Sequence, residues 1–75
     1  MNAPLRPSAP AGSLEELREY TAECLRLVVL YASHAQDLAE LGDDLGLFTN
    51  TRKLLAAAEA MALTVQDLRM RRCMD

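Results

Sequence analysis

The 75-residue chain is poor in the residue types that most catalytic and cofactor sites require. It has no tryptophan, only one histidine, two cysteines, and three glycines that form no cluster. Without a glycine cluster there is no loop that could cradle phosphate groups. Cys24 and Cys73 stand far apart and outside any Cys/His spacing typical of zinc sites. The sequence therefore offers no catalytic, metal-binding or cofactor-binding set, and we expect no enzyme and no cofactor.

Aromatic residues are also scarce, at 4% of the chain, although 51% of the chain is apolar. The apolar content is therefore mainly Leu, Ala, Val and Met, the residues that commonly pack helices together. A chain below ~70–80 residues rarely builds a sufficient core without disulfides, metals or association. The composition predicts a helical domain that depends on association.

The chain has no strong net charge and no long apolar run. Its formal charge is −3, so no overall field attracts it to nucleic acid or anionic lipid. The longest apolar-rich stretch, residues 24–32, contains Arg26 and is about half the ~20 residues that a membrane span needs. The N-terminal residues lack the pattern of a secretion signal. We expect a cytoplasmic protein with no membrane partner.

Residues 1–12 contain prolines at positions 4, 7 and 10. Each proline removes a backbone donor and disfavours helix at the residue before it. This pattern predicts a disordered N-terminal arm, although prolines spaced by three would also suit a short docking segment.

A helical domain is expected over residues 13–75, beginning with a helix over about residues 14–41. Ser13 and Glu16 form a capping-box pattern, and the acidic first turns suit the helix dipole. Gly42 can adopt the left-handed conformation that ends a helix. The expected inward seam of this helix has heptad spacing: Leu14, Leu17, Thr21, Cys24, Val28, Tyr31, Ala35 and Leu38.

A turn over residues 42–49 and a second helix over about residues 50–72 are expected to follow. Residues 45–49 also fit a single helical turn or an early start of this helix, but Gly46 and Asn50 argue against regular helix. The expected seam of the second helix is Leu47, Thr51, Leu54, Ala58, Met61, Val65 and Leu68.

Together these patterns predict an all-α fold, an antiparallel two-helix hairpin. Such a hairpin would dimerise into a four-helix bundle or dock on a helical partner. It would also place the acidic start of the first helix beside the basic end of the second. Glu16, Glu19 and Glu23 would then face Arg69, Arg71 and Arg72.

Leu30 and Leu63 interrupt the otherwise polar outer stripes of the two helices, both near mid-length. A helix that is apolar on most sides needs more than one neighbour. We therefore predict a protein interface on the following residues: Leu27, Leu30, Tyr31, Leu63 and Met70.

Three other features of the sequence have side chains capable of chemistry. The cluster Arg69, Arg71 and Arg72 could contact phosphates, but no aromatic residue is interleaved with it. His34 with Asp37 and Glu40 occurs once and in the reverse order of known di-iron motifs, so we expect no metal there. Cys73, near the C-terminus, could be reactive or form an intermolecular disulfide.

The predicted function is a small non-enzymatic interaction module, such as an adaptor, regulatory subunit or co-chaperone. It would act by packing helices against itself, as a homodimer, or against a helical protein partner. In size and layout the chain is similar to small plasmid-copy regulators that dimerise as hairpins and to short helical co-chaperones of type III secretion. These similarities imply two alternatives: a small dimeric nucleic-acid-binding regulator using the C-terminal arginines, and a secretion co-chaperone.

Overall fold

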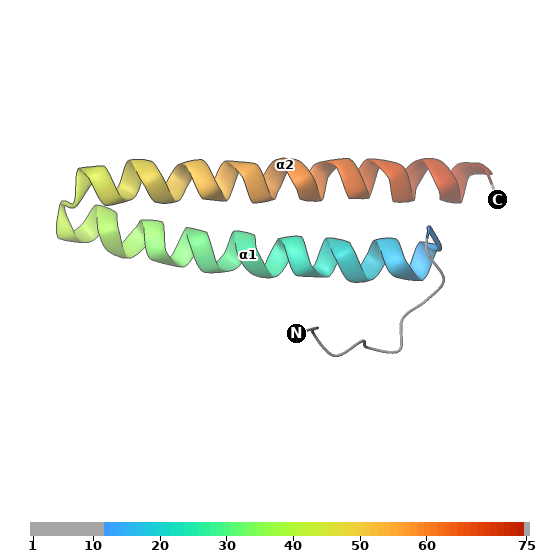
Figure 1. The fold of residues 1–75 in the computed structure, drawn as a ribbon, viewed down its shortest axis with the longest axis horizontal. Coiled ribbons are helices and arrows are strands. Elements are labelled where there is room, and N and C mark those ends of the chain that lie inside the picture. The colour runs from blue at the N-terminus through green and yellow to red at the C-terminus, as the bar shows by residue number, and fades with distance from the viewer. Residues whose placement is uncertain (1–11, 75) are drawn as a thin grey trace, which may run out of the picture.

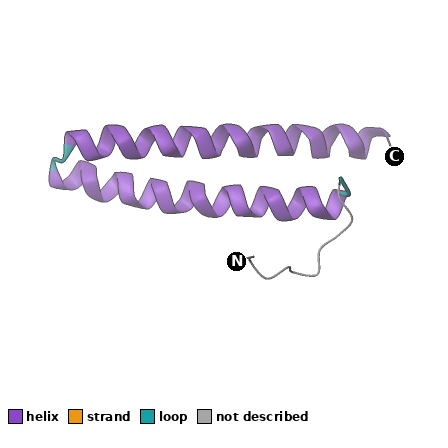
Figure 2. Ribbon diagram, in the orientation of Figure 1, coloured by secondary structure: helices purple, strands orange, loops and turns teal. Residues whose placement is uncertain are grey.

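The computed structural model describes residues 12–74, which form two α-helices joined at Gly42 and Asp43. Helix α1 spans Leu14–Leu41 and helix α2 spans Asp44–Met74. The helices run antiparallel and side by side along their whole length (Figure 1), and the described residues contain no strand (Figure 2). The predicted all-α hairpin is confirmed. The predicted N-terminal arm, apart from Gly12, lies outside the described residues.

Both ends of α1 are fixed by local hydrogen bonds that its sequence predicted. The Ser13 Oγ accepts the backbone N–H of Glu16 at 3.0 Å, which satisfies one of the free donors of the first turn. Gly42 has a φ of 75°, and the N–H groups of Gly42 and Asp43 donate to the carbonyls of Ala39 and Leu38 at 3.2 and 2.9 Å. This left-handed closure explains why α1 ends where expected.

The expected turn over residues 42–49 is wrong, because α2 begins at Asp44 and not near residue 50. Asp43 supplies the missing start signal: its Oδ1 accepts the Gly46 N–H at 2.9 Å, and its carbonyl accepts the Leu47 N–H at 2.9 Å. This cap offsets the cost of a glycine in the first turn. Asn50 lies inside the helix because its side chain has a partner on α1, where it donates to the Tyr31 carbonyl. The helix also continues to Met74, past the expected end near residue 72.

The two predicted seams face each other. All eight seam residues of α1 are buried or half-buried, and all seven of α2 are half-buried. The fully covered part is small: Cys24 and Ala35, at 5% and 8% exposure, are the buried apolar residues among those described, and Thr21 lies with them. No large side chain in residues 12–73 is completely buried. The hairpin thus has a narrow core.

A polar contact crosses the seam near the open end, where α1 starts and α2 ends. The Thr21 hydroxyl lies 2.9 Å from the Thr64 hydroxyl and 2.7 Å from the Leu17 carbonyl, and Thr64 donates to the Met61 carbonyl at 2.9 Å. Together with the bond from Asn50 to Tyr31, this contact sets the register of α2 against α1. No helix of the described chain has the length and apolar character needed to span a membrane.

Candidate interaction surface

Large apolar side chains cover much of the outside of the hairpin. Eleven of them in the described residues are more than a third exposed: Tyr20, Leu25, Leu27, Val29, Leu30, Leu41, Leu45, Phe48, Leu55, Leu63 and Met70. Scattered single leucines on a surface are ordinary, but contiguous apolar patches are a mark of interaction sites. The positions of these side chains around the helices therefore decide what the surface can bind.

The predicted interface residues do not form one patch on a single hairpin. Leu27 and Leu30 are exposed on α1, and Leu63 and Met70 are exposed on α2. Tyr31 is half-buried in the seam. At about 100° per residue, Leu30 and Leu63 lie on the sides of their helices that point away from the opposite helix. One partner helix could not contact both of them, so any interface of this kind would be two separate surfaces.

Other exposed apolar residues, outside the predicted interface, lie on one side of the hairpin. Leu25 and Val29 of α1 each follow a seam residue by one position, as do Phe48, Leu55 and Ala62 of α2. Because both helices are right-handed and run antiparallel, a one-residue step from each seam leads to the same side of the hairpin. We call these five residues the lateral face.

The lateral face is open to solvent, and exposed Arg52 and Glu59 lie on α2 between its apolar residues. Val29 is 68% exposed and Leu55 is 63% exposed. The other one-step positions within residues 25–36 of α1 and 48–66 of α2 are Ala32, Gln36, Arg52, Glu59 and Gln66. The signal that identifies this face in the sequence is the spacing of four between Leu25 and Val29 and of seven between Phe48, Leu55 and Ala62. These spacings indicate a shared face only when the relative direction of the two helices is known.

Charge is divided unevenly between the two ends of the hairpin. Residues 27–51 contain no Lys or Arg, whereas the turn end carries Asp37, Glu40, Asp43 and Asp44. At the open end, Glu15, Arg18 and Arg69 occupy one-step positions of the lateral face, and all three are exposed. The lateral face is therefore bordered by acidic residues at the turn end and by two arginines and Glu15 at the open end.

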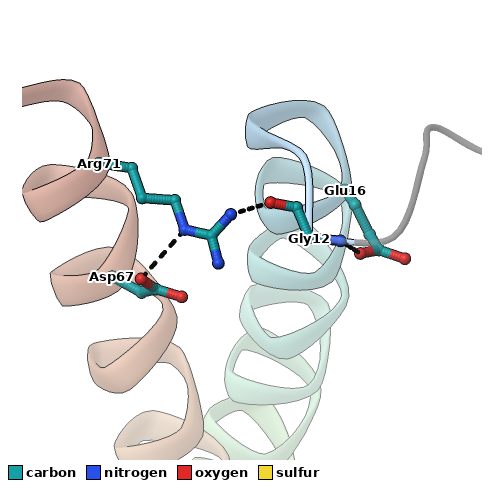
Figure 3. A network of polar contacts seen from close by, with 4 residues as sticks. All are labelled: Gly12, Glu16, Asp67 and Arg71. Carbon is teal, nitrogen blue, oxygen red and sulfur yellow. Dashed lines mark hydrogen bonds and ion pairs between the residues drawn. The ribbon is translucent and has the colours of Figure 1, made fainter. Parts of the chain in front are cut away.

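We expected the glutamates of α1 to lie beside the arginines of α2. Among the described residues, no ion pair joins the two groups. Arg71 instead pairs with Asp67 on its own helix at 3.3 Å and donates to the Gly12 carbonyl, while Glu16 accepts the Gly12 N–H (Figure 3). Glu23 pairs with Arg26 on α1 at 2.9 Å. The helix ends are thus joined through the backbone of Gly12 and not through direct Glu–Arg pairs.

The arginine cluster also does not converge on one surface. Arg69 and Arg72 are exposed, and Arg71 is half-buried in the network with Asp67 and Gly12. Helical rotation of about 100° per residue directs Arg69 and Arg71 to nearly opposite sides of α2. A single nucleic-acid strand would therefore contact at most part of the cluster.

Nothing in residues 12–74 gathers into a chemical centre. No group of three or more His, Cys, Asp or Glu side chains lies close enough together there to hold a metal ion. Cys24 is buried and Cys73 is exposed, and both are free thiols. The main hollows of the described surface are shallow and open, one on α1 beside Leu27 and Leu30 and one near the end of α2 beside Arg69 and Cys73.

Comparisons of this chain with protein-family models, with curated proteins and with solved structures find no match.

Proposed function

We propose that this chain is a non-enzymatic interaction module that works by packing its helices against other helices. The observation that supports the proposal is the imbalance between core and surface. Two apolar residues of the described chain are buried, whereas eleven large apolar side chains are exposed. An adaptor, a regulatory subunit and a co-chaperone all fit this description.

The energetics favour association. Covering a Val, Leu, Ile, Phe or Met side chain contributes about 1.5–3 kcal/mol, and here most such side chains keep a large exposed fraction. Single helices are marginal in water and gain most of their stability from packing of an apolar face. A hairpin with one narrow seam therefore gains more from an added helix layer than from any rearrangement within itself.

The partner chemistry follows from the shape of the exposed side chains. A helix with apolar residues at spacings of three and four would fit beside Leu27 and Leu30 on α1, or beside Leu63 and Met70 on α2, in the helix-in-groove mode. Tyr31 would support the first surface from within the seam. The hairpin itself has helices of this kind, so the partner is a second copy or another amphipathic helical protein.

Dilution tests the proposal. Circular dichroism and sedimentation of the purified full chain are measured from about 100 µM down to about 0.1 µM. In a separate experiment, the chain is crosslinked in the cells that produce it. We expect helicity and melting temperature to fall on dilution, and the chain to be crosslinked into a complex in cells. A monomer that melts cooperatively at a concentration-independent temperature and forms no complex in cells would overturn the proposal.

A further inference from the structure

The exposed large apolar side chains of α2 lie along one side of the helix. Its described residues include five of them: Leu45, Phe48, Leu55, Leu63 and Met70. At about 100° of rotation per residue, these five fall within an arc of about 80°, whereas the six on α1 spread over more than half of its circumference. Arg52 and Glu59 are exposed within the same arc. We call the five apolar residues, together with Arg52 and Glu59, the α2 stripe.

An antiparallel pairing of two copies of α2 matches the apolar residues of the α2 stripe. With a two-fold axis between Leu55 and Ala56, Phe48 lies beside the second copy's Leu63, because both residues are equally far from the axis along the helix. The two copies of Leu55 meet at the axis, next to the small Ala56. Phe48, Leu55 and Leu63 are each 60–67% exposed in the hairpin, so this pairing covers side chains that α1 leaves open.

Charge selects both the direction and the register of this pairing. Arg52 and Glu59 are equally far from the same axis, so each arginine lies beside the second copy's glutamate. A parallel pairing would set Arg52 and Glu59 each against its own counterpart and would join the two acidic turns. An antiparallel pairing with its axis one helical turn nearer the open end would bring the two copies of Glu59 together. Opposite charges fix the register of an interface, and like charges suppress the wrong arrangements.

We propose that the α2 stripe binds the α2 stripe of a second copy of this chain, with the two helices antiparallel and Arg52 beside the second copy's Glu59. The inference rests on the proposed function and names the partner of its α2 surface. A second copy is the fitting partner because an isologous interface must be complementary to itself when turned end for end, and the α2 stripe is.

The size of the contact indicates how tightly the two copies bind. The paired helices would overlap over about 40 Å, and a helix is about 10–12 Å wide, so each copy contributes roughly 450 Å². The total lies at the small end of the range for specific interfaces. We therefore expect a dimer that dissociates at micromolar concentrations.

A charge swap tests the pairing without loss of folding. Arg52 and Glu59 have no charged residue three or four positions away on α2, so their reversal leaves the hairpin itself intact. Arg52→Glu and Glu59→Arg should each raise the dissociation constant measured by sedimentation about five- to tenfold, because two symmetric pairs become repulsive. The double variant should return to within about twofold of wild type.

Lys53→Glu is the matched control for Arg52→Glu. Lys53 is the adjacent residue, is also exposed, and has no charged residue three or four positions away, but it lies about 100° further round the helix and outside the α2 stripe. Its reversal should change the dissociation constant by less than about twofold. Equal weakening by Lys53→Glu and Arg52→Glu, or a double variant no tighter than the single ones, overturns the inference.

Single cysteines locate the two-fold axis. In a chain with Cys24→Ala and Cys73→Ala, Leu55→Cys places the two introduced thiols at the axis. Glu59→Cys places them about 10 Å apart along the helices, beyond the reach of a disulfide. Mild oxidation should link the Leu55→Cys chains rapidly within the dimer and leave the Glu59→Cys chains unlinked. The reverse result, or linkage of neither, overturns the inference. A wild-type chain that stays monomeric at about 100 µM yet is crosslinked to another protein in cells would refute the second copy and leave the proposed function standing.

Discussion

At the residue scale, the contact between Thr21 and Thr64 is a polar pair inside an apolar seam. Each hydroxyl has a backbone acceptor on its own helix, Leu17 for Thr21 and Met61 for Thr64. Either threonine therefore keeps a hydrogen bond when the other is removed. A polar pair of this kind gives little net stability but restricts how the two helices can slide.

We accordingly expect Thr21→Val and Thr64→Val to be mild. Each single variant should unfold within about 1 kcal/mol of wild type, and the double variant at or above wild type, because both hydroxyls are replaced by apolar groups of the same shape. Thermal unfolding at one fixed protein concentration measures this, since association shifts the midpoint. A loss of more than about 2 kcal/mol in the double variant would instead make the pair a main source of stability.

At the scale of elements, the two helices differ in how far their bounds could be predicted. The bounds of α1 follow from Ser13, Glu16 and Gly42, whose effects are local. The start of α2 could not be predicted, because Gly46 and Asn50 each disfavour helix in the sequence. The contacts that offset this preference form only once the hairpin has folded. Asn50 is stabilised by a carbonyl of α1, and Asp43 acts as a cap only once the Gly42 turn has formed.

The seams and the candidate site illustrate the same limit. Heptad spacing was sufficient to predict which residues of each helix face inward, because burial on a helix repeats with the helical turn. The lateral face depends on the relative direction of the two helices and on which of their sides meet. The sequence pattern of each helix alone specifies neither. The predicted interface at Leu27, Leu30, Leu63 and Met70 stays a prediction, and the structure adds that it comprises two surfaces.

We expect removal of the Asp43 cap to loosen the first turns of α2. The helix would then begin closer to residue 50, where the sequence predicted it. Asp43→Ala leaves the Gly46 N–H without its side-chain acceptor, which costs about 1 kcal/mol. Amide hydrogen exchange should accelerate at residues 44–49 and remain unchanged beyond Asn50. Asp37→Ala removes the same charge from an exposed site on α1 and serves as the control. Equal exchange in the two variants would mean that packing alone holds this first turn.

At the scale of the whole molecule, Cys73 reports how two copies are arranged. It is exposed near the end of α2, whereas Cys24 is buried and can be replaced by alanine to leave a single thiol. If the turns lie at opposite ends, the two Cys73 residues of a dimer are separated by roughly 50 Å along the helices. A disulfide requires Cα atoms within about 7 Å, so it cannot form inside such a dimer.

Oxidation of Cys24→Ala protein should therefore link dimers to one another and not the two chains within a dimer. The yield of disulfide-linked chains should rise with protein concentration, and the linked species should sediment as assemblies larger than a dimer. Dimers with both turns at one end would give the contrary result, because their Cys73 thiols would be neighbours: rapid linkage even in dilute samples, with no increase in mass beyond the dimer. Disulfide formation by Cys73 thus distinguishes the two arrangements. They bury similar apolar area and differ mainly in which charged residues lie beside the acidic turn.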